Sequence, residues 1–263
     1  MMMLPAQAVI GVVGTRALPG DAAYAGSSAQ QLVEEALEEA RVMAGEGIDA
    51  LMLQNIAALP TGRRTGALSI AWMTRIAGEI RRHVDVPLGI SCLEDDPVAV
   101  LSIADAVEAA FVRLKVYVGA MVGPDGIREG SAHAAQTFLR DLASRPAIYA
   151  DVYDRTRTPL GTQTLGEMVH EATWFGRADG LVLTGRHHAE TVEFLREGRR
   201  HATVPLLAGG GATPETIGPL LESADGVIVA TYLKRDGQLL NPVDRTRVRA
   251  LMNAAAAQRG RPR

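Results

Sequence analysis

Charged and aliphatic residues alternate in the segment FVRLKVY, residues 111–117. If this segment is a β-strand, its period of two places Arg113, Lys115 and Tyr117 on one face. Buried cations need carboxylates or an anionic ligand, because an unpaired buried charge is costly. Arg113 and Lys115 are therefore candidates for stabilising negative charge on a substrate, and a structural layer of ion pairs is the alternative.

A carboxylate occurs in the segment AIYADVY, residues 147–153. The same alternation predicts that Tyr149, Asp151 and Tyr153 share a face, with Asp151 near the carboxyl end of the strand. Asp151 is the first candidate for a general acid/base. It is equally the expected partner of a buried cation on the preceding strand, and the two roles are compatible.

Three acidic residues, Glu94, Asp95 and Asp96, follow the apolar segment VPLGISC. They could transfer protons or hold a hard cation such as Mg²⁺, although no cofactor is required by the sequence. The alternative is helix capping by Asp96 together with solvation of the triplet. Glu94 is the functional candidate of the three, and Asn55 offers hydrogen bonds to a ligand.

A glycine run, residues 209–211, precedes Ala212-Thr213-Pro214. Missing side chains let backbone amides approach an anion where a helix begins, although a tight turn alone would also use glycine. Lys234 could reach the same anion, with a solvated surface lysine as the alternative. The predicted phosphate-binding residues are Gly209, Gly210, Gly211, Ala230, Thr231, Thr184, Gly185 and Lys234.

Short apolar segments alternate eight times with longer amphipathic stretches. This pattern predicts a single (β/α)8 barrel, with an open doubly wound α/β sheet as the alternative. In such a barrel the active site lies at the carboxyl ends of the strands, where the candidate residues are found. The predicted strands are residues 8–15, 48–55, 86–92, 110–117, 147–153, 180–185, 204–210 and 226–232.

The composition of the chain indicates which classes of binding partner and which cellular location to expect. The 263 residues are 47% hydrophobic and fit one domain, with residues 256–263 expected as a frayed tail. A net charge of -3 argues against nucleic acid. The single cysteine, Cys92, and the lack of an apolar stretch of about 20 residues predict a soluble cytoplasmic protein without a membrane segment. The oligomeric state is left open, a homo-oligomer included.

The chain resembles the BtpA family, which includes the SgcQ-like proteins, from its first strand to its last helix. The resemblance rests on GIDALMLQN, VPLGISCLEDD, AAFVRLKVYVGAMVGPDGIREG, RADGLVLTG, VPLLAGGGATPE and ADGVIVATYLKRDGQLLNPVDRTRV. It implies a barrel of the ribulose-phosphate-binding type. The family pattern usually has other residues at Gln54, Ser91, Asp95, the Leu114-Lys115 pair and the Asp154-Arg155 pair, which suggests an altered substrate.

Two functions follow from these observations. The first is an enzyme that acts on a sugar phosphate or a nucleotide-like phosphate ester by acid/base isomerisation or bond cleavage. Redox chemistry is not expected, because the first predicted strand is not followed by the glycine spacing of a dinucleotide-binding motif. The second function, implied by the family's name and its role in photosystem I biogenesis, is a non-catalytic stability factor that binds a protein partner.

Overall fold

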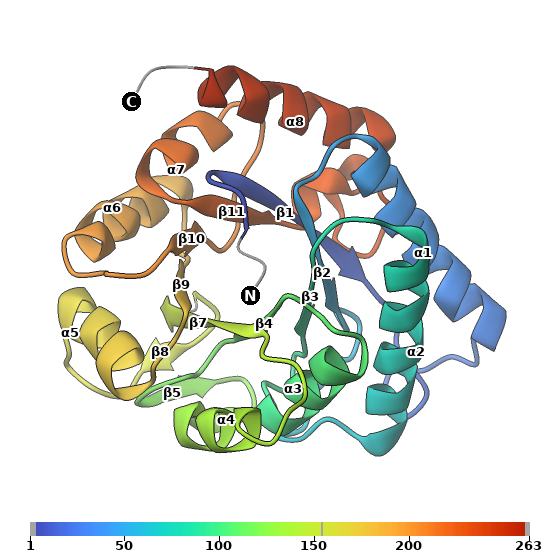
Figure 1. Cartoon of the computed structure of the whole chain (residues 1–263), viewed down its shortest axis with the longest axis horizontal. Coiled ribbons are helices and arrows are strands. Elements are labelled where there is room, and N and C mark those ends of the chain that lie inside the picture. The colour runs from blue at the N-terminus through green and yellow to red at the C-terminus, as the bar shows by residue number, and fades with distance from the viewer. Residues whose placement is uncertain (1–3, 154, 261–263) are drawn as a thin grey trace.

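The computed structural model describes residues 4–153 and 155–260. Eight parallel strands close into a barrel in the order β1-β11-β10-β9-β7-β4-β3-β2, with helices around it (Figure 1). The predicted (β/α)8 barrel is confirmed, and the open sheet is wrong because the first strand pairs with the last, Ala8 lying opposite Gly226. The barrel strands are β1 (Ala8–Gly14), β2 (Ala50–Gln54), β3 (Leu88–Ser91), β4 (Phe111–Leu114), β7 (Ala147–Tyr153), β9 (Gly180–Leu183), β10 (Leu206–Ala208) and β11 (Gly226–Val229).

Most helices whose start was predicted from a polar N-cap residue begin at the predicted position. Ser28 and Gln31 form a reciprocal capping box at α1, and Asp96 caps α3. The helix expected after Thr213 begins later, at Ile217, because residues 213–216 form a turn in which Thr216 Oγ1 accepts a hydrogen bond from the Thr213 amide. The α-helices are α1 (Ala29–Gly45), α2 (Ala67–His83), α3 (Pro97–Ala106), α4 (Ala132–Leu139), α5 (Leu165–His170), α6 (His188–Arg199), α7 (Ile217–Ser223) and α8 (Arg245–Arg259); short helical segments are η1 (Glu171–Phe175), η2 (Thr231–Leu233) and η3 (Arg235–Gly237).

Two apolar clusters hold the barrel together. The larger one lies between strands and helices, and the smaller one fills the barrel interior. Inside, the rings of Phe111 and Tyr149 meet edge to face with centroids 5.5 Å apart. Phe111 also occupies the space where a Cβ on Gly89 would lie, 2.2 Å from its ring atoms. The middle of the barrel is therefore solid, and polar groups collect at its end.

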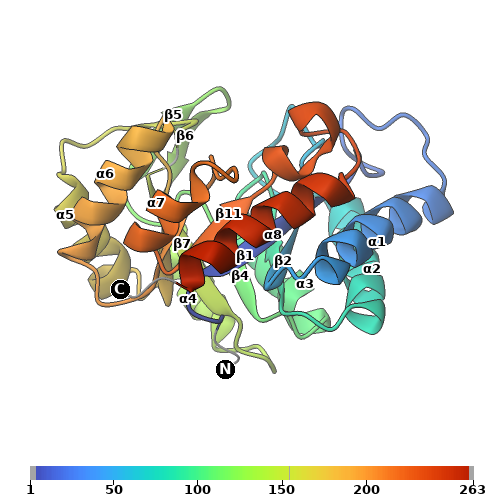
Figure 2. The ribbon, with the colours of Figure 1, turned by 90° about the horizontal axis from the view of Figure 1, so that it is seen from above.

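A small antiparallel sheet that the sequence analysis did not predict is inserted between barrel elements. It has the order β6-β5-β8 and consists of β5 (Ala120–Gly123), β6 (Gly126–Glu129) and β8 (Thr158–Pro159). Figure 2 shows the β5–β6 hairpin at the end of the barrel away from the N-terminus, the end where the segment after β11 also lies. The hairpin is thus part of the surroundings of the candidate site.

The carboxyl-terminal region is better ordered than a frayed tail. Helix α8 continues through Arg259, Gln258 is buried, and Arg259 pairs with Asp49. The expectation for residues 256–259 is therefore wrong, and residues 261–263, like 1–3 and Asp154, lie outside the described residues. In the described part of the chain, no helix combines the length and apolar character needed to cross a bilayer.

Candidate active site

A layer of polar and small residues covers the apolar interior at the carboxyl ends of the strands. Each residue of this layer lies two positions after a strand residue that faces the barrel interior. Because side chains alternate between the two faces of a strand, the residues of the layer face the interior as well. Neighbouring members contact one another, since Gln54 Nε2 donates to Ser91 Oγ over 3.4 Å and Ser91 Oγ donates to the Arg113 carbonyl over 3.3 Å. The layer consists of Gly14, Gln54, Ser91, Arg113, Asp151, Thr184, Gly209 and Ala230.

Arg113 and Asp151 form a bidentate ion pair inside the barrel. The guanidinium Nε and Nη2 atoms each donate to one carboxylate oxygen over 2.8 Å. The side chain of Asp151 is fully buried and that of Arg113 is 10% exposed. The pairing expected from the sequence is therefore present, and it engages both oxygens of the acid/base candidate. A role of Asp151 in proton transfer stays a prediction.

Two aromatic side chains do not face the interior as predicted. Tyr117 is buried in the outer cluster, where its hydroxyl donates to the Gly176 carbonyl over 2.5 Å. The alternation fails because β4 ends at Leu114. Tyr153 instead packs on Phe194, since a register shift between Asp151 and Tyr153 interrupts the alternation.

Glu94 and Asn55 lie together at the ends of β3 and β2. Asn55 Nδ2 donates to Glu94 Oε2 over 2.9 Å, and Asn55 Oδ1 accepts from the Leu93 amide over 2.8 Å. Glu94 is 5% exposed and Asn55 is fully buried. Glu94 Oε1 accepts no hydrogen bond from the residues that the structure describes. One carboxylate oxygen of Glu94 is thus left for a ligand.

The other two acids of the triplet bind backbone amides. Asp96 caps α3 as predicted, accepting from the Val98 and Ala99 amides. Asp95 accepts from the Lys115 and Val116 amides over 2.7 Å each, while burial raises its pKa to about 6. Among the described residues no group of three His, Cys, Asp or Glu side chains could hold a metal ion. Lys115 is half-buried and is not without a partner. Its role in stabilising negative charge stays a prediction.

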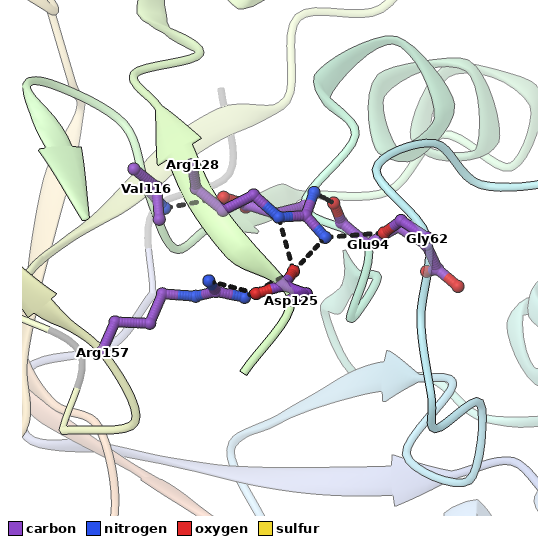
Figure 3. Close-up of polar contacts among 7 residues, drawn as sticks. Gly62, Glu94, Val116, Asp125, Arg128 and Arg157 are labelled. Carbon is purple, nitrogen blue, oxygen red and sulfur yellow. Dashed lines mark hydrogen bonds and ion pairs between the residues drawn. The ribbon is translucent and has the colours of Figure 1, made fainter. Parts of the chain in front are cut away.

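A buried guanidinium joins the inserted hairpin to the Glu94 loop. Arg128 of β6, 7% exposed, donates to the carbonyls of Glu94 and Gly62 and pairs with Asp125 (Figure 3). Arg157, which follows the barrel strand β7, makes a bidentate pair with the same Asp125 carboxylate. These hydrogen bonds fix the backbone of Glu94 from outside the barrel. Sequence reasoning missed this cluster, although the Pro124-Asp125-Gly126 turn signal could have indicated the hairpin.

We expect replacement of Asp125 by Asn to lower the free energy of unfolding by about 2 kcal/mol at pH 7. Hydrogen bonding by Arg157 and Arg128 holds the pKa of Asp125 well below its ordinary value, against burial. A carboxylate whose pKa is depressed by folding stabilises the folded state fully at pH values above its unfolded pKa of about 3.9. This stabilisation is lost progressively as the pH falls from there towards the folded pKa. The difference in melting temperature between wild type and Asp125→Asn should therefore narrow from pH 5 to pH 3. The control is Glu129→Gln, an exposed carboxylate on the same hairpin; an equal effect there would contradict the assignment.

The predicted phosphate loops lie side by side, because β10 pairs with β11. Gly209 departs from the prediction, since its amide donates to the Leu183 carbonyl over 2.9 Å as part of the sheet. The amides of Gly210, Gly211, Ala230 and Thr231 donate to no acceptor among the described residues. Gly210 and Gly211 have φ angles of 156° and 79°, and a Cβ on either would meet open space. Four unpaired amides therefore occur at the same end of two adjacent strands.

Of the three remaining predicted phosphate contacts, Lys234 and Gly185 are engaged by other protein groups. Lys234 is 1% exposed, so the solvated-surface alternative is wrong. Its Nζ lies 2.5 and 2.6 Å from the two carboxylate oxygens of Glu39 on α1. Glu39 Oε2 also accepts from the Gly14 amide, which ties the segment after β11 to β1. The Gly185 amide donates to Thr191 Oγ1, so Gly185 serves the turn into α6.

Comparison with known proteins places the chain in a family. The model of the BtpA family matches residues 5–257, and the chain belongs to that family. It is 35% identical over 254 residues to the photosystem I biogenesis protein BtpA of Synechocystis sp., covering 94% of this chain and 88% of the relative. It is 27% identical to the putative sgc region protein SgcQ of Escherichia coli K12, covering 94% and 93%.

The fold is also found in distant structures. A thiamine phosphate pyrophosphorylase from Pyrococcus furiosus superposes with a TM-score of 0.61 at 16% identity, covering 96% of this chain and 97% of that one. This likeness concerns the barrel fold. The family model, which matches residues 5–257, confirms the resemblance to the BtpA family that the sequence motifs carry.

Proposed function

We propose that this protein is an enzyme that binds a phosphorylated small molecule at the carboxyl end of the barrel and acts on it by acid/base isomerisation or bond cleavage. The observation that carries the proposal is the set of four unpaired amides in the adjacent loops after β10 and β11. Backbone amides that point at a common ligand without steric obstruction are suited to phosphate oxygens. A phosphate bound there lies over the polar layer that contains the candidate catalytic groups.

Glu94 is the better candidate for moving a proton. It has one oxygen held by Asn55 and one without a hydrogen bond from the described residues, whereas both oxygens of Asp151 receive hydrogen bonds from Arg113. The Arg113–Asp151 pair supplies a fixed dipole under the site. Arg113 and Lys115 are proposed to offset negative charge that develops on the substrate. The name of the Pyrococcus furiosus neighbour includes thiamine phosphate, a phosphorylated small molecule, which is compatible with this chemistry.

A thermal-shift screen tests the proposal directly. The ligands are inorganic phosphate, phosphorylated sugars and nucleotides, each compared with the unphosphorylated compound. A ligand present at 100 times its Kd stabilises the folded state by about 2.7 kcal/mol. We expect at least one sugar phosphate or nucleotide to raise Tm more than its unphosphorylated counterpart. If no phosphorylated compound raises Tm, the proposed phosphate site is contradicted.

We expect Gly211→Ala to weaken binding of inorganic phosphate at least fivefold, because the added methyl group takes up open space beside the unpaired Gly211 amide. The matched control is Gly47→Ala. Gly47 has a φ angle of 84° and open space beside it, so the substitution imposes comparable backbone strain far from these loops. Isothermal titration of both variants decides the result. Equal loss of phosphate affinity in the two variants would remove the loop from the site.

The second function, a non-catalytic factor that binds a protein partner, is favoured by one observation. Trp174 and Phe175 are adjacent in η1 and are 72% and 64% exposed. The name of the Synechocystis relative points in the same direction. The thermal-shift screen separates the two functions, because a partner-binding factor without a phosphate site would show no ligand-dependent Tm.

A further inference from the structure

Thr184 has a buried hydroxyl group without a protein partner. The residue is 5% exposed, and its Oγ1 atom forms no hydrogen bond with any described residue. A buried hydroxyl that lacks a hydrogen bond destabilises the folded state, so in most proteins such a group has a partner. An orphaned hydroxyl inside a candidate site therefore points to a ligand atom as its partner.

This hydroxyl lies beside the loop after β10, residues 209–211, which we call the phosphate loop. Val182, two residues earlier on β9, belongs to the interior cluster, so Thr184 faces the same interior. A Cβ on Gly209 would lie 1.8 Å from Thr184 Oγ1 and 3.2 Å from Arg113 Nη2. The hydroxyl thus lies against the first glycine of the phosphate loop, on the side of the Arg113–Asp151 pair.

We infer that Thr184 hydrogen-bonds the carbon skeleton of the ligand next to its phosphate, and that the site selects phosphate monoesters bearing a hydroxyl or carbonyl oxygen on that skeleton. This inference rests on the proposed phosphate site. The two amide-bearing loops hold the phosphate, and the Thr184 hydroxyl, which lies against Gly209, takes the first polar group of the attached chain. A hydroxyl can donate or accept, so both alcohol and carbonyl oxygens suit it.

Two esters of equal charge and similar size test the inference. Glycerol 3-phosphate carries hydroxyl groups on the three-carbon chain, and n-propyl phosphate carries none. A single net hydrogen bond corresponds to a preference of about fivefold, so wild-type protein should bind glycerol 3-phosphate about five times more tightly. Thr184→Val should abolish this preference, and Thr184→Ser should keep it. Binding of inorganic phosphate is measured in both variants, so that the ratio of the two ester affinities is compared at a known phosphate affinity.

A second readout needs no ligand. Val replaces the orphaned hydroxyl with a methyl group of the same shape, so Thr184→Val should raise the Tm of the unliganded protein by roughly 2–4 °C. The control is Thr15→Val. Thr15 Oγ1 is also buried without a partner, but the residue follows the inward-facing Gly14 and so lies on the other side of its strand. That variant should keep the ester preference.

The outcomes are distinguishable from failure of the proposed function. If neither ester nor inorganic phosphate binds, the phosphate site itself is wrong. If both esters bind equally to wild type, or if Thr184→Val retains the preference, the site exists and the inference about Thr184 is overturned. Equal weakening of inorganic phosphate and both esters in Thr184→Val would assign the hydroxyl to the phosphate group and likewise overturn it.

Discussion

Replacement of Asp151 by Asn is expected to lower the free energy of unfolding by about 3–5 kcal/mol. The substitution preserves size but removes the negative charge beside the Arg113 guanidinium. The Arg113 side chain is 10% exposed and donates two hydrogen bonds of 2.8 Å to Asp151. The variant therefore breaks a bidentate ion pair that is buried inside the barrel. For a chain of this length the melting temperature should fall by roughly 6 °C or more.

The matched control is Glu35→Gln. Glu35 pairs with Arg16 at the surface, with side chains 44% and 63% exposed, and exposed pairs contribute at most about 1 kcal/mol. Chemical denaturation of both variants compares a buried with an exposed arginine–carboxylate pair. If Asp151→Asn is no less stable than Glu35→Gln but turns over substrate at least about 10²-fold more slowly, Asp151 is an acid/base rather than a structural partner.

Replacement of Glu94 by Gln is expected to lower turnover by about 10²-fold or more while the protein stays folded. The amide of Gln can keep the hydrogen bond to Asn55, which lies 2.9 Å from the carboxylate, but it cannot carry the proton. The measurement uses the phosphorylated compound identified by thermal shift as substrate, with kcat and KM determined separately. A loss in kcat with little change in KM identifies an interaction made in the transition state.

Asp96→Asn is the control for Glu94→Gln, because it makes the same change of acid to amide two residues away. Asp96 caps α3, so this variant should keep wild-type turnover with at most a small change in stability. Similar turnover losses in the two variants would mean that the acidic loop as a whole, rather than the Glu94 carboxylate, supports the reaction.

The fold and part of the site could be predicted from local patterns. Eight apolar segments separated by amphipathic stretches are sufficient for the barrel, since each segment has to bury both faces in a parallel sheet. Alternation on the strand at residues 147–153 placed Asp151 correctly in the interior, and Asp96 before Pro97 predicted the cap of α3. These features depend on residues within a few positions of one another.

Tertiary structure decided which polar groups have partners. Lys234 is bound by Glu39, 195 positions away, because the segment after β11 packs against α1 when the barrel closes. Asn55 and Glu94 meet because β2 and β3 are neighbours, and Arg128 reaches Glu94 because the hairpin folds over the loop after β3. Local patterns of residues are enough to define the barrel and the end of it at which polar residues collect. Ring closure and the inserted hairpin decided which of those residues are paired and which, like Thr184, have a hydroxyl group without a hydrogen bond to any described residue, because pairing depends on elements that are distant in the chain.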